Sequence, residues 1–286
     1  MIQLGTPGSQ GDEATDGVPV VFMHDSADDV EKFFELVLII PSYFMPFPEP
    51  AYISDVLAVL RLSHKYDVGY LHRRALQHLS VGYYSASVEE YMNKPVKCHL
   101  KYRDKDQPAS DEARLTRDFA LITAAHEVGA LWLLPMTYYI ACARNFEDIL
   151  TSVEKGANES LVRTCLAGCH YLSRATIRSN AFLAKSMENC LDSEQCLQLR
   201  RACLAGLVTT LGRVLDVKPF EFWADTWPDL HPITGTLRVK FCQPCYEAGQ
   251  RAYKGGTRGL LESPSVLFQF ARLARIECLE GGRHGR

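Results

Sequence analysis

The residues with the clearest chemical potential are the cysteines, of which the 286-residue chain has ten. Two residues separate Cys242 from Cys245, a spacing that lets both thiolates bind one tetrahedral metal ion. A structural zinc site needs two more ligands, and the best candidates are Cys190 and Cys196, which lie close in sequence at a predicted helix boundary. These four cysteines predict a closed zinc site with a role in stability and not in catalysis.

Two other interpretations of the cysteines stay open. Free cysteine packs as a small apolar side chain, so the thiols would then be inert parts of a core. A redox pair is the third interpretation, although Cys242 and Cys245 are not expected to open a helix after a strand. Cys169 with His170 is a second source of the two remaining ligands. The N-terminal residues lack the basic and apolar regions of a secretory signal, so we expect a cytoplasmic or nuclear chain with reduced thiols.

The motifs that usually mark an enzyme are absent from the sequence. His126 and Glu127 resemble the start of a zinc-protease helix, but Ala130 stands where the second histidine would be. No nucleophile elbow, phosphate-binding loop or dinucleotide fingerprint is present, and Gly255–Gly256 is predicted to lie in an ordinary loop. The sequence therefore predicts no catalysis and identifies no small-molecule substrate. The alternative is an enzyme whose site is assembled in space within the C-terminal half.

Composition and charge exclude some classes of partner. Hydrophobic residues make up 47% of the chain and charged residues 23%, which is ordinary for a globular protein. The net charge of −3 creates no field that would attract nucleic acid or an anionic membrane. No apolar run approaches the roughly 20 residues that span a bilayer. We therefore expect neither nucleic-acid binding nor a membrane location.

The clearest predicted elements are two helices within residues 51–80. In the first, an apolar stripe recurs at helical spacing, and its members are Ile53, Val56, Leu57, Leu60 and Ser63. The residues that follow, Asp67 to Gly69, predict a break in which Gly69 takes the left-handed conformation. The second helix is expected to bury Leu71, Ala75, His78 and Leu79.

The segments before this pair predict a strand, a helix and a connector. Residues 1–17 are polar and predicted to be disordered, and residues 18–23 form an apolar run of strand length. Ser26 is expected to cap a helix that ends before Pro41. The proline-rich stretch 41–50 is then an extended connector anchored by aromatic residues.

The C-terminal half is predicted to be helical. Residues 91–112 are charged with mixed signs, which indicates a solvated linker. Ser110 can cap the next helix and Pro135 can open another. Further helices are expected over 161–175, 196–215 and 265–279. These helices must position the cysteines.

The order of elements in residues 18–80 resembles the second half of a BTB/POZ domain. The phrase Leu60-x-Leu-Ser-His-Lys-Tyr-Asp-Val68, followed by Leu71-x-x-Arg-Ala-Leu-x-x-Leu79, is similar to the large fungal families of BTB-domain proteins, and residues 127–139 also resemble them. The resemblance implies an α+β, predominantly α-helical fold. It also implies a protein-interaction module that self-associates or recruits another protein, as an adaptor for a cullin-type ubiquitin ligase or in transcriptional control.

In that family, further strands and a helical hairpin precede the strand–helix unit, so we expect either a truncated gene model or a member that has lost this half. The strand at 18–23 would then lack a partner. Apolar side chains would be left for a protein partner or a second copy of the chain. This expected interaction surface comprises Val20, Phe22, Phe33, Phe34, Val37, Phe44 and Phe47.

The expected organisation is therefore a disordered N-terminus (1–17), a partial BTB/POZ-like domain (18–90), a charged linker (91–112) and a helical C-terminal domain with cysteine-rich loops (113–286). We predict a non-enzymatic interaction protein with no cofactor except a possible structural zinc ion. Besides the enzyme, the remaining alternative is a zinc-stabilised helical protein with a regulatory or nucleic-acid-associated role.

Overall fold

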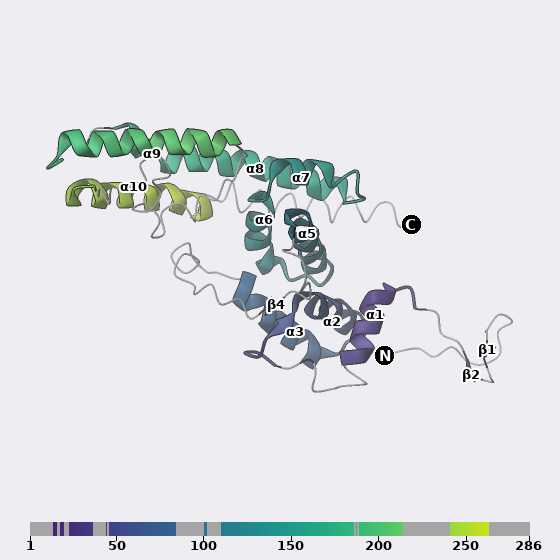
Figure 1. The fold of residues 1–286 in the computed structure, drawn as a ribbon. Helices are drawn as coiled ribbons and strands as arrows, with labels where there is room; N and C mark the ends of the chain where they lie inside the picture. The colour runs from purple at the N-terminus through teal and green to yellow at the C-terminus, as the bar shows by residue number, and fades with distance from the viewer. Residues whose placement is uncertain are drawn as a thin grey trace. The chain divides into compact units, whose positions relative to one another are not determined.

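The computed structural model describes residues 14–15, 18–19, 23–36, 44, 46–83, 100–101, 110–185, 187, 189–213 and 241–262. These residues fall into two compact units (Figure 1). The first unit includes residues 1–82, 97–106 and 127–129, and the second includes residues 83–96, 107–126 and 130–286. The chain is predominantly helical, as predicted, with two small two-stranded sheets.

The part of the first unit that the structure describes is built on three helices. They are α1 (Ala27–Phe34), α2 (Ile53–Lys65) and α3 (Gly69–Tyr83). Helix α1 packs against α2. The predicted apolar stripe of α2 is buried throughout, and so are the four residues that α3 was expected to bury. The helical pair is therefore confirmed.

The turn between α2 and α3 differs from the prediction. Asp67 adopts the left-handed conformation with φ 58°, whereas Gly69 is already the first residue of α3. The Val68 N–H donates to the Ser63 carbonyl at 2.8 Å and the Asp67 N–H to the His64 carbonyl at 3.4 Å. This pair of bonds is the Schellman motif, which places the left-handed residue one position after the C-cap Tyr66. Aspartate tolerates that conformation better than most non-glycine residues, so the glycine was not needed.

Helix α1 begins where the acidic residues predicted it, but without the predicted side-chain cap. Ser26 occupies the N-cap position and its hydroxyl makes no cap hydrogen bond. Asp28 and Asp29 lie in the first turn, where their negative charges interact favourably with the helix dipole.

Each strand that the structure describes spans two residues, and the pairing differs from the prediction. Strand β2 (Val18–Pro19) pairs antiparallel with β1 (Ala14–Thr15), so the strand expected to lack a partner has one, supplied by the segment predicted to be disordered. Strand β3 (Ala51–Tyr52) pairs in parallel with β4 (Leu100–Lys101), which draws part of the predicted linker into the first unit. Two-residue strands are too short to produce a recognisable alternation of apolar and polar residues.

The second unit is helical. Its elements are α5 (Asp111–Glu127), η2 (Leu131–Leu133), α6 (Leu134–Cys142), α7 (Phe146–Thr151), α8 (Glu159–Ser179), η3 (Ala181–Ala184), α9 (Ser193–Arg213) and α10 (Gln243–Glu262). Helix α8 contacts α6, α7, η3 and α10. Two predicted helix starts are confirmed: the Ser110 hydroxyl accepts the Ala113 N–H at 3.2 Å, and Pro135 lies in the first turn of α6.

One helix of this unit begins as predicted and another departs from the prediction. Helix α5, which begins at the predicted Ser110 cap, ends at Glu127, and Gly129 beyond it takes a φ of 69°. Helix α10 includes Gly255 and Gly256, which were predicted to lie in a loop. The predicted helix over 265–279 lies outside the described residues. None of the described helices combines the length and apolar character needed to cross a membrane.

Candidate metal centre

The structure brings the four predicted ligands together in the second unit. The sulfur atoms of Cys190, Cys196, Cys242 and Cys245 all lie within 4.8 Å of one another. We call this set the four-cysteine centre. In the part of the chain that the structure describes, no other group of three or more potential metal ligands is found.

Each cysteine is placed by the start of a helix. The Asp192 carboxylate accepts the Gln195 N–H at 3.0 Å and so caps α9, which fixes Cys196 in the second turn, while Cys190 lies just before the cap. Cys242 precedes α10, and its carbonyl accepts the Tyr246 N–H at 3.0 Å. Cys245 therefore lies in the first turn of α10.

The sulfur spacing fits a tetrahedral metal ion. The Sγ atoms of Cys190 and Cys242 are 3.8 Å apart. With metal–sulfur bonds of about 2.3 Å, a regular tetrahedron places its sulfur atoms about 3.8 Å apart. A disulfide would require about 2.05 Å, and all four cysteines are free. The centre therefore offers four separate sulfur ligands.

Backbone N–H groups point at these sulfurs and would stabilise their thiolate forms. The Cys242 N–H donates to the Cys196 sulfur at 3.3 Å. The Cys242 sulfur accepts hydrogen bonds from the N–H groups of Cys245 and Leu191. Such bonds orient ligands around a metal and leave the sulfur charge partly neutralised.

The thiol pKa values show how unfavourable four negative charges are in this space. Burial raises the pKa of the Cys242 thiol, but the hydrogen bonds from the N–H groups of Cys245 and Leu191, together with those from neighbouring thiols, outweigh it and lower the pKa to about 6. Burial, followed by the thiols of Cys190 and Cys242, raises the pKa of Cys245 far above its usual range. Burial also raises the pKa of Cys196. A divalent cation would compensate the cost of burial that raises the pKa values of Cys196 and Cys245.

The four cysteines differ in exposure. Cys196 and Cys245 are buried, with 0% and 4% of their surface exposed. Cys190 and Cys242 are partly exposed. Four protein ligands fill a tetrahedral coordination shell, so the centre has no open position for substrate or water.

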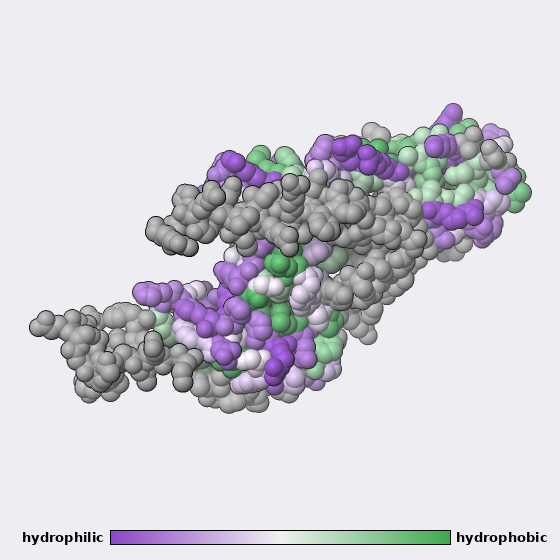
Figure 2. All heavy atoms as spheres, turned by 180° about the vertical axis from the view of Figure 1, so that it is seen from behind, coloured by the Kyte–Doolittle hydropathy of each residue, from purple (hydrophilic) through white to green (hydrophobic). Residues whose placement is uncertain are grey.

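The surroundings hold the centre in place. Phe182, Leu183 and Tyr253 form a buried apolar cluster that joins η3 to α10, and Phe241, next to Cys242, packs against it. The buried guanidinium of Arg200 donates to the carbonyls of Cys196 and Lys185. The elements that carry the ligands are therefore also joined by apolar packing and hydrogen bonds. In Figure 2, hydrophobic and hydrophilic residues alternate over the end of the unit that carries α9 and α10.

These positions bear on the two other proposals for the cysteines, the Cys169 and His170 ligand pair and the redox pair. Cys169 donates its thiol to the Cys142 carbonyl at 3.1 Å and His170 is exposed, so the fallback pair lies outside the centre. The sequence argument against a redox pair was wrong in one respect, because Cys242 and Cys245 do open a helix. Two further thiols within 4.8 Å distinguish this arrangement from an isolated pair.

The predicted interaction surface is only partly exposed. Phe33 and Phe44 are buried, whereas Phe34 and Phe47 are 39% and 38% exposed. Val20, Phe22 and Val37 lie outside the residues whose side chains the structure describes. His78 is buried, as expected from its position in the second predicted helix, and the rings of Phe44 and Phe47 lie 5.5 and 6.3 Å from it.

Two cavities elsewhere contain polar side chains that are already paired. The first unit has an open cavity of about 420 Å³ beside α1 and α2. Within it Arg61 forms ion pairs with Asp29 at 3.0 Å and Glu127 at 3.1 Å, and Lys65 pairs with Asp25 at 2.6 Å. The Arg61 and Lys65 cations of this cavity are thus directed at its carboxylates.

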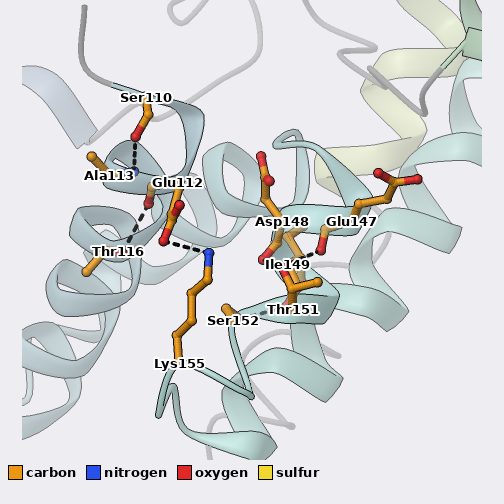
Figure 3. A network of polar contacts seen from close by, with 10 residues as sticks. All are labelled: Ser110, Glu112, Ala113, Thr116, Glu147, Asp148, Ile149, Thr151, Ser152 and Lys155. Carbon is orange, nitrogen blue, oxygen red and sulfur yellow. Dashed lines mark hydrogen bonds and ion pairs between the residues drawn. The ribbon is translucent and has the colours of Figure 1, made fainter. Parts of the chain in front are cut away.

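The second unit has a cavity of about 280 Å³ lined by α5, α7 and the start of α8. Lys155 reaches across to Glu112 at 2.6 Å (Figure 3). The hydroxyls of Thr116, Thr151 and Ser152 donate to backbone carbonyls of their own helices or turns. This network stabilises helix ends and does not resemble an activated nucleophile.

Comparisons of the chain with protein-family models, with curated proteins and with solved structures found no match. Among the described residues, the four-cysteine centre is the most specific feature that indicates a function.

Proposed function

We propose that the chain is a non-catalytic protein-interaction protein whose second unit is stabilised by a structural zinc ion. The observation that carries the proposal is the convergence of four free sulfurs within 4.8 Å. A tetrahedral set of thiolates is typical of zinc or of iron–sulfur chemistry, and a closed set of four suits a structural ion. Zinc would join the segment before α9 to the start of α10.

Metal analysis of the purified full-length chain tests the zinc. We expect about one zinc ion per chain, with little iron or copper. Cys196→Ser should lose the metal because it removes a buried ligand, whereas Cys203→Ser removes a thiol of the same helix that lies outside the centre and should retain it. Less than about 0.2 equivalent of zinc per chain in the unsubstituted protein would refute the site.

The interaction role rests on the first unit. Its order of short strand, helix, connector and buried helical pair supports the proposed BTB/POZ-like module. Phe34 and Phe47 retain exposed aromatic surface, which in such modules suits self-association or capture of another protein. We therefore propose a homo-oligomer or a protein partner as the occupant of this surface.

Light scattering after size-exclusion chromatography tests self-association. The unsubstituted chain should form a dimer or larger assembly, and Phe34→Ser with Phe47→Ser should shift it toward monomer. Tyr70→Ser, which changes another exposed aromatic residue of this unit, is the matched control. A monomer at every concentration would count against self-association.

The alternatives receive less support. From 189 to 199 and from 241 to 249 the sequence contains no lysine or arginine, and the exposed carboxylates of Asp192, Glu194 and Glu247 lie close in sequence to the ligands. A nucleic-acid interface at the centre would need the opposite charge. The paired charges in the cavity beside α1 and α2 likewise disfavour catalysis there.

A further inference from the structure

We infer that the four-cysteine centre is an oxidation-sensitive switch, in which a hydroperoxide converts Cys190 and Cys242 to a disulfide and so releases the metal. The inference rests on the proposed zinc site. Two features of the centre carry it: the separation of one pair of sulfurs and the exposure of the same pair.

The first feature is distance. The Cys190 and Cys242 sulfurs are 3.8 Å apart, whereas a disulfide bond is about 2.05 Å long. Closing this gap requires a movement of about 2 Å shared by two side chains. Neither cysteine lies inside a helix: Cys190 is in the segment before α9 and Cys242 immediately precedes α10. Their backbones are thus freer to adjust than those of the two ligands within helices.

The second feature is access. Cys190 and Cys242 are the two partly exposed ligands, and Cys196 and Cys245 are the two buried ones. Oxidation of a thiol requires contact between the sulfur and the oxidant, so an oxidant from solvent meets Cys190 and Cys242 first. The accessible pair is also the pair at 3.8 Å. Four cysteines could form six different disulfides, and these two features favour the one between Cys190 and Cys242.

The reaction balances with one hydroperoxide per centre. One of the two thiolates attacks a peroxide oxygen, the O–O bond breaks, and a sulfenic acid forms while the released hydroxide takes a proton from solvent. The second thiolate attacks the sulfenic sulfur, the S–S bond forms, and the second hydroxide leaves as water after taking another proton. The two sulfurs lose two electrons and the peroxide gains them. Zinc keeps its charge throughout.

Metal release follows from the loss of ligands. A disulfide sulfur carries no negative charge and is a poor ligand, so two of the four positions are lost at once. The remaining thiolates of Cys196 and Cys245 cannot complete a tetrahedral shell. Reduction of the disulfide in the presence of zinc would restore the centre.

The experiment uses the zinc-loaded full-length chain. Hydrogen peroxide is added in steps up to one equivalent, zinc release is followed with a chromogenic chelator, and the intact mass is measured. We expect release of zinc in proportion to peroxide and a mass decrease of about 2 Da, both reversed by dithiothreitol and added zinc. Oxidation without zinc release would overturn the switch. Absence of zinc before any peroxide is added would instead refute the proposed function.

Peptide mapping identifies the pair. Cleavage after Glu188, Glu194 and Arg200 separates Cys190 from Cys196. Cleavage after Lys240 and Glu247 leaves Cys242 and Cys245 in one peptide, 241–247, in which fragmentation before Pro244 distinguishes them. A crosslink between 189–194 and the Cys242 fragment is expected. A crosslink confined to 241–247, or one to 195–200, would overturn the assignment.

A substitution separates coordination from disulfide formation. Cys190→His converts the centre to three cysteines and one histidine, a set that also binds structural zinc, but it removes one partner of the disulfide. Zinc released by one equivalent of peroxide should fall several-fold, whereas Cys203→Ser should behave as the unsubstituted chain. Equal release from Cys190→His would overturn the inference, and if that variant binds no zinc the peptide map of the unsubstituted chain decides.

Discussion

Removing zinc from the four-cysteine centre should lower the free energy of unfolding of the second unit by about 4 kcal/mol. The perturbation is either a strong chelator or the substitution Cys196→Ser. The expected loss arises because a bound ion ties the segment before α9 to the start of α10. Without it, the unfolded chain recovers the conformations that this tie excludes.

The magnitude follows from the separation of the ligands in sequence. Cys196 and Cys242 are 46 residues apart. For a closed loop of this length, the chain-entropy relation used for disulfides gives about 13 cal/mol/K, or about 4 kcal/mol at 25 °C.

Urea denaturation followed by circular dichroism measures the effect. Four samples are compared. They are the zinc-loaded chain, the same chain with chelator, and Cys196→Ser with and without chelator. The variant should resemble the chelated chain and should not respond to chelator, whereas Cys203→Ser should differ from the unsubstituted chain by less than about 1 kcal/mol. Coincident denaturation curves for the loaded and chelated chain would refute the reasoning.

Four further predictions concern the fold and the centre. Gly69→Ala should raise the free energy of unfolding by about 0.5–1 kcal/mol, because the residue lies in α3 and an added Cβ would meet only the Arg73 Nη1 at 3.9 Å; a loss measured by urea denaturation would contradict the assigned turn. Asn158→Ala should cost about 1 kcal/mol in the same assay, since its side chain caps α8 by accepting the N–H groups of Ser160 and Leu161; an unchanged urea midpoint would argue against this cap. Leu60→Ala, at a fully buried position of α2, should cost about 2–5 kcal/mol, and a smaller loss would mean that the core collapses around the cavity. Zinc affinity measured by calorimetry should fall as pH is lowered from about 8 to about 6, because protons compete for the ligand thiols, including those of Cys196 and Cys245 whose pKa values are raised; a pH-independent affinity would exclude thiolate ligands.

The residues that could be predicted from the sequence are those whose placement depends on local spacing. The stripe from Ile53 to Ser63 repeats at helical period over three turns, which is enough to specify a buried helix face. The two-residue gap between Cys242 and Cys245 similarly restricts both sulfurs to one side of a helix start. Cys190 and Cys196 could be predicted as the other two ligands because they are close in sequence and a predicted helix boundary lies beside them.

The features that could not be predicted depend on competing local preferences or on contacts distant in sequence. Gly69 is the residue most tolerant of the left-handed conformation, but the hydrogen bonds that close α2 place that conformation two residues earlier, at Asp67. Gly255 and Gly256 each disfavour a helix by about 1 kcal/mol relative to alanine, so the sequence alone argues against α10. The pairing of Ala51 with Leu100 joins residues that share no local signal.

Helix α8 has a consequence for how the second unit opens. It spans 21 residues, about 31 Å, and Leu161 in its first turns lines the cavity beside α5 and α7, whereas its C-terminal end leads into η3, which contacts α9 and α10. One continuous helix is therefore shared by two neighbourhoods with different packing partners. Amide hydrogen exchange along α8 should be graded: the last turns report the opening of the end that carries the four-cysteine centre, and the first turns report the opening of α5 and α7. Loss of zinc would then fray this helix from its C-terminal end while its N-terminal turns stay protected.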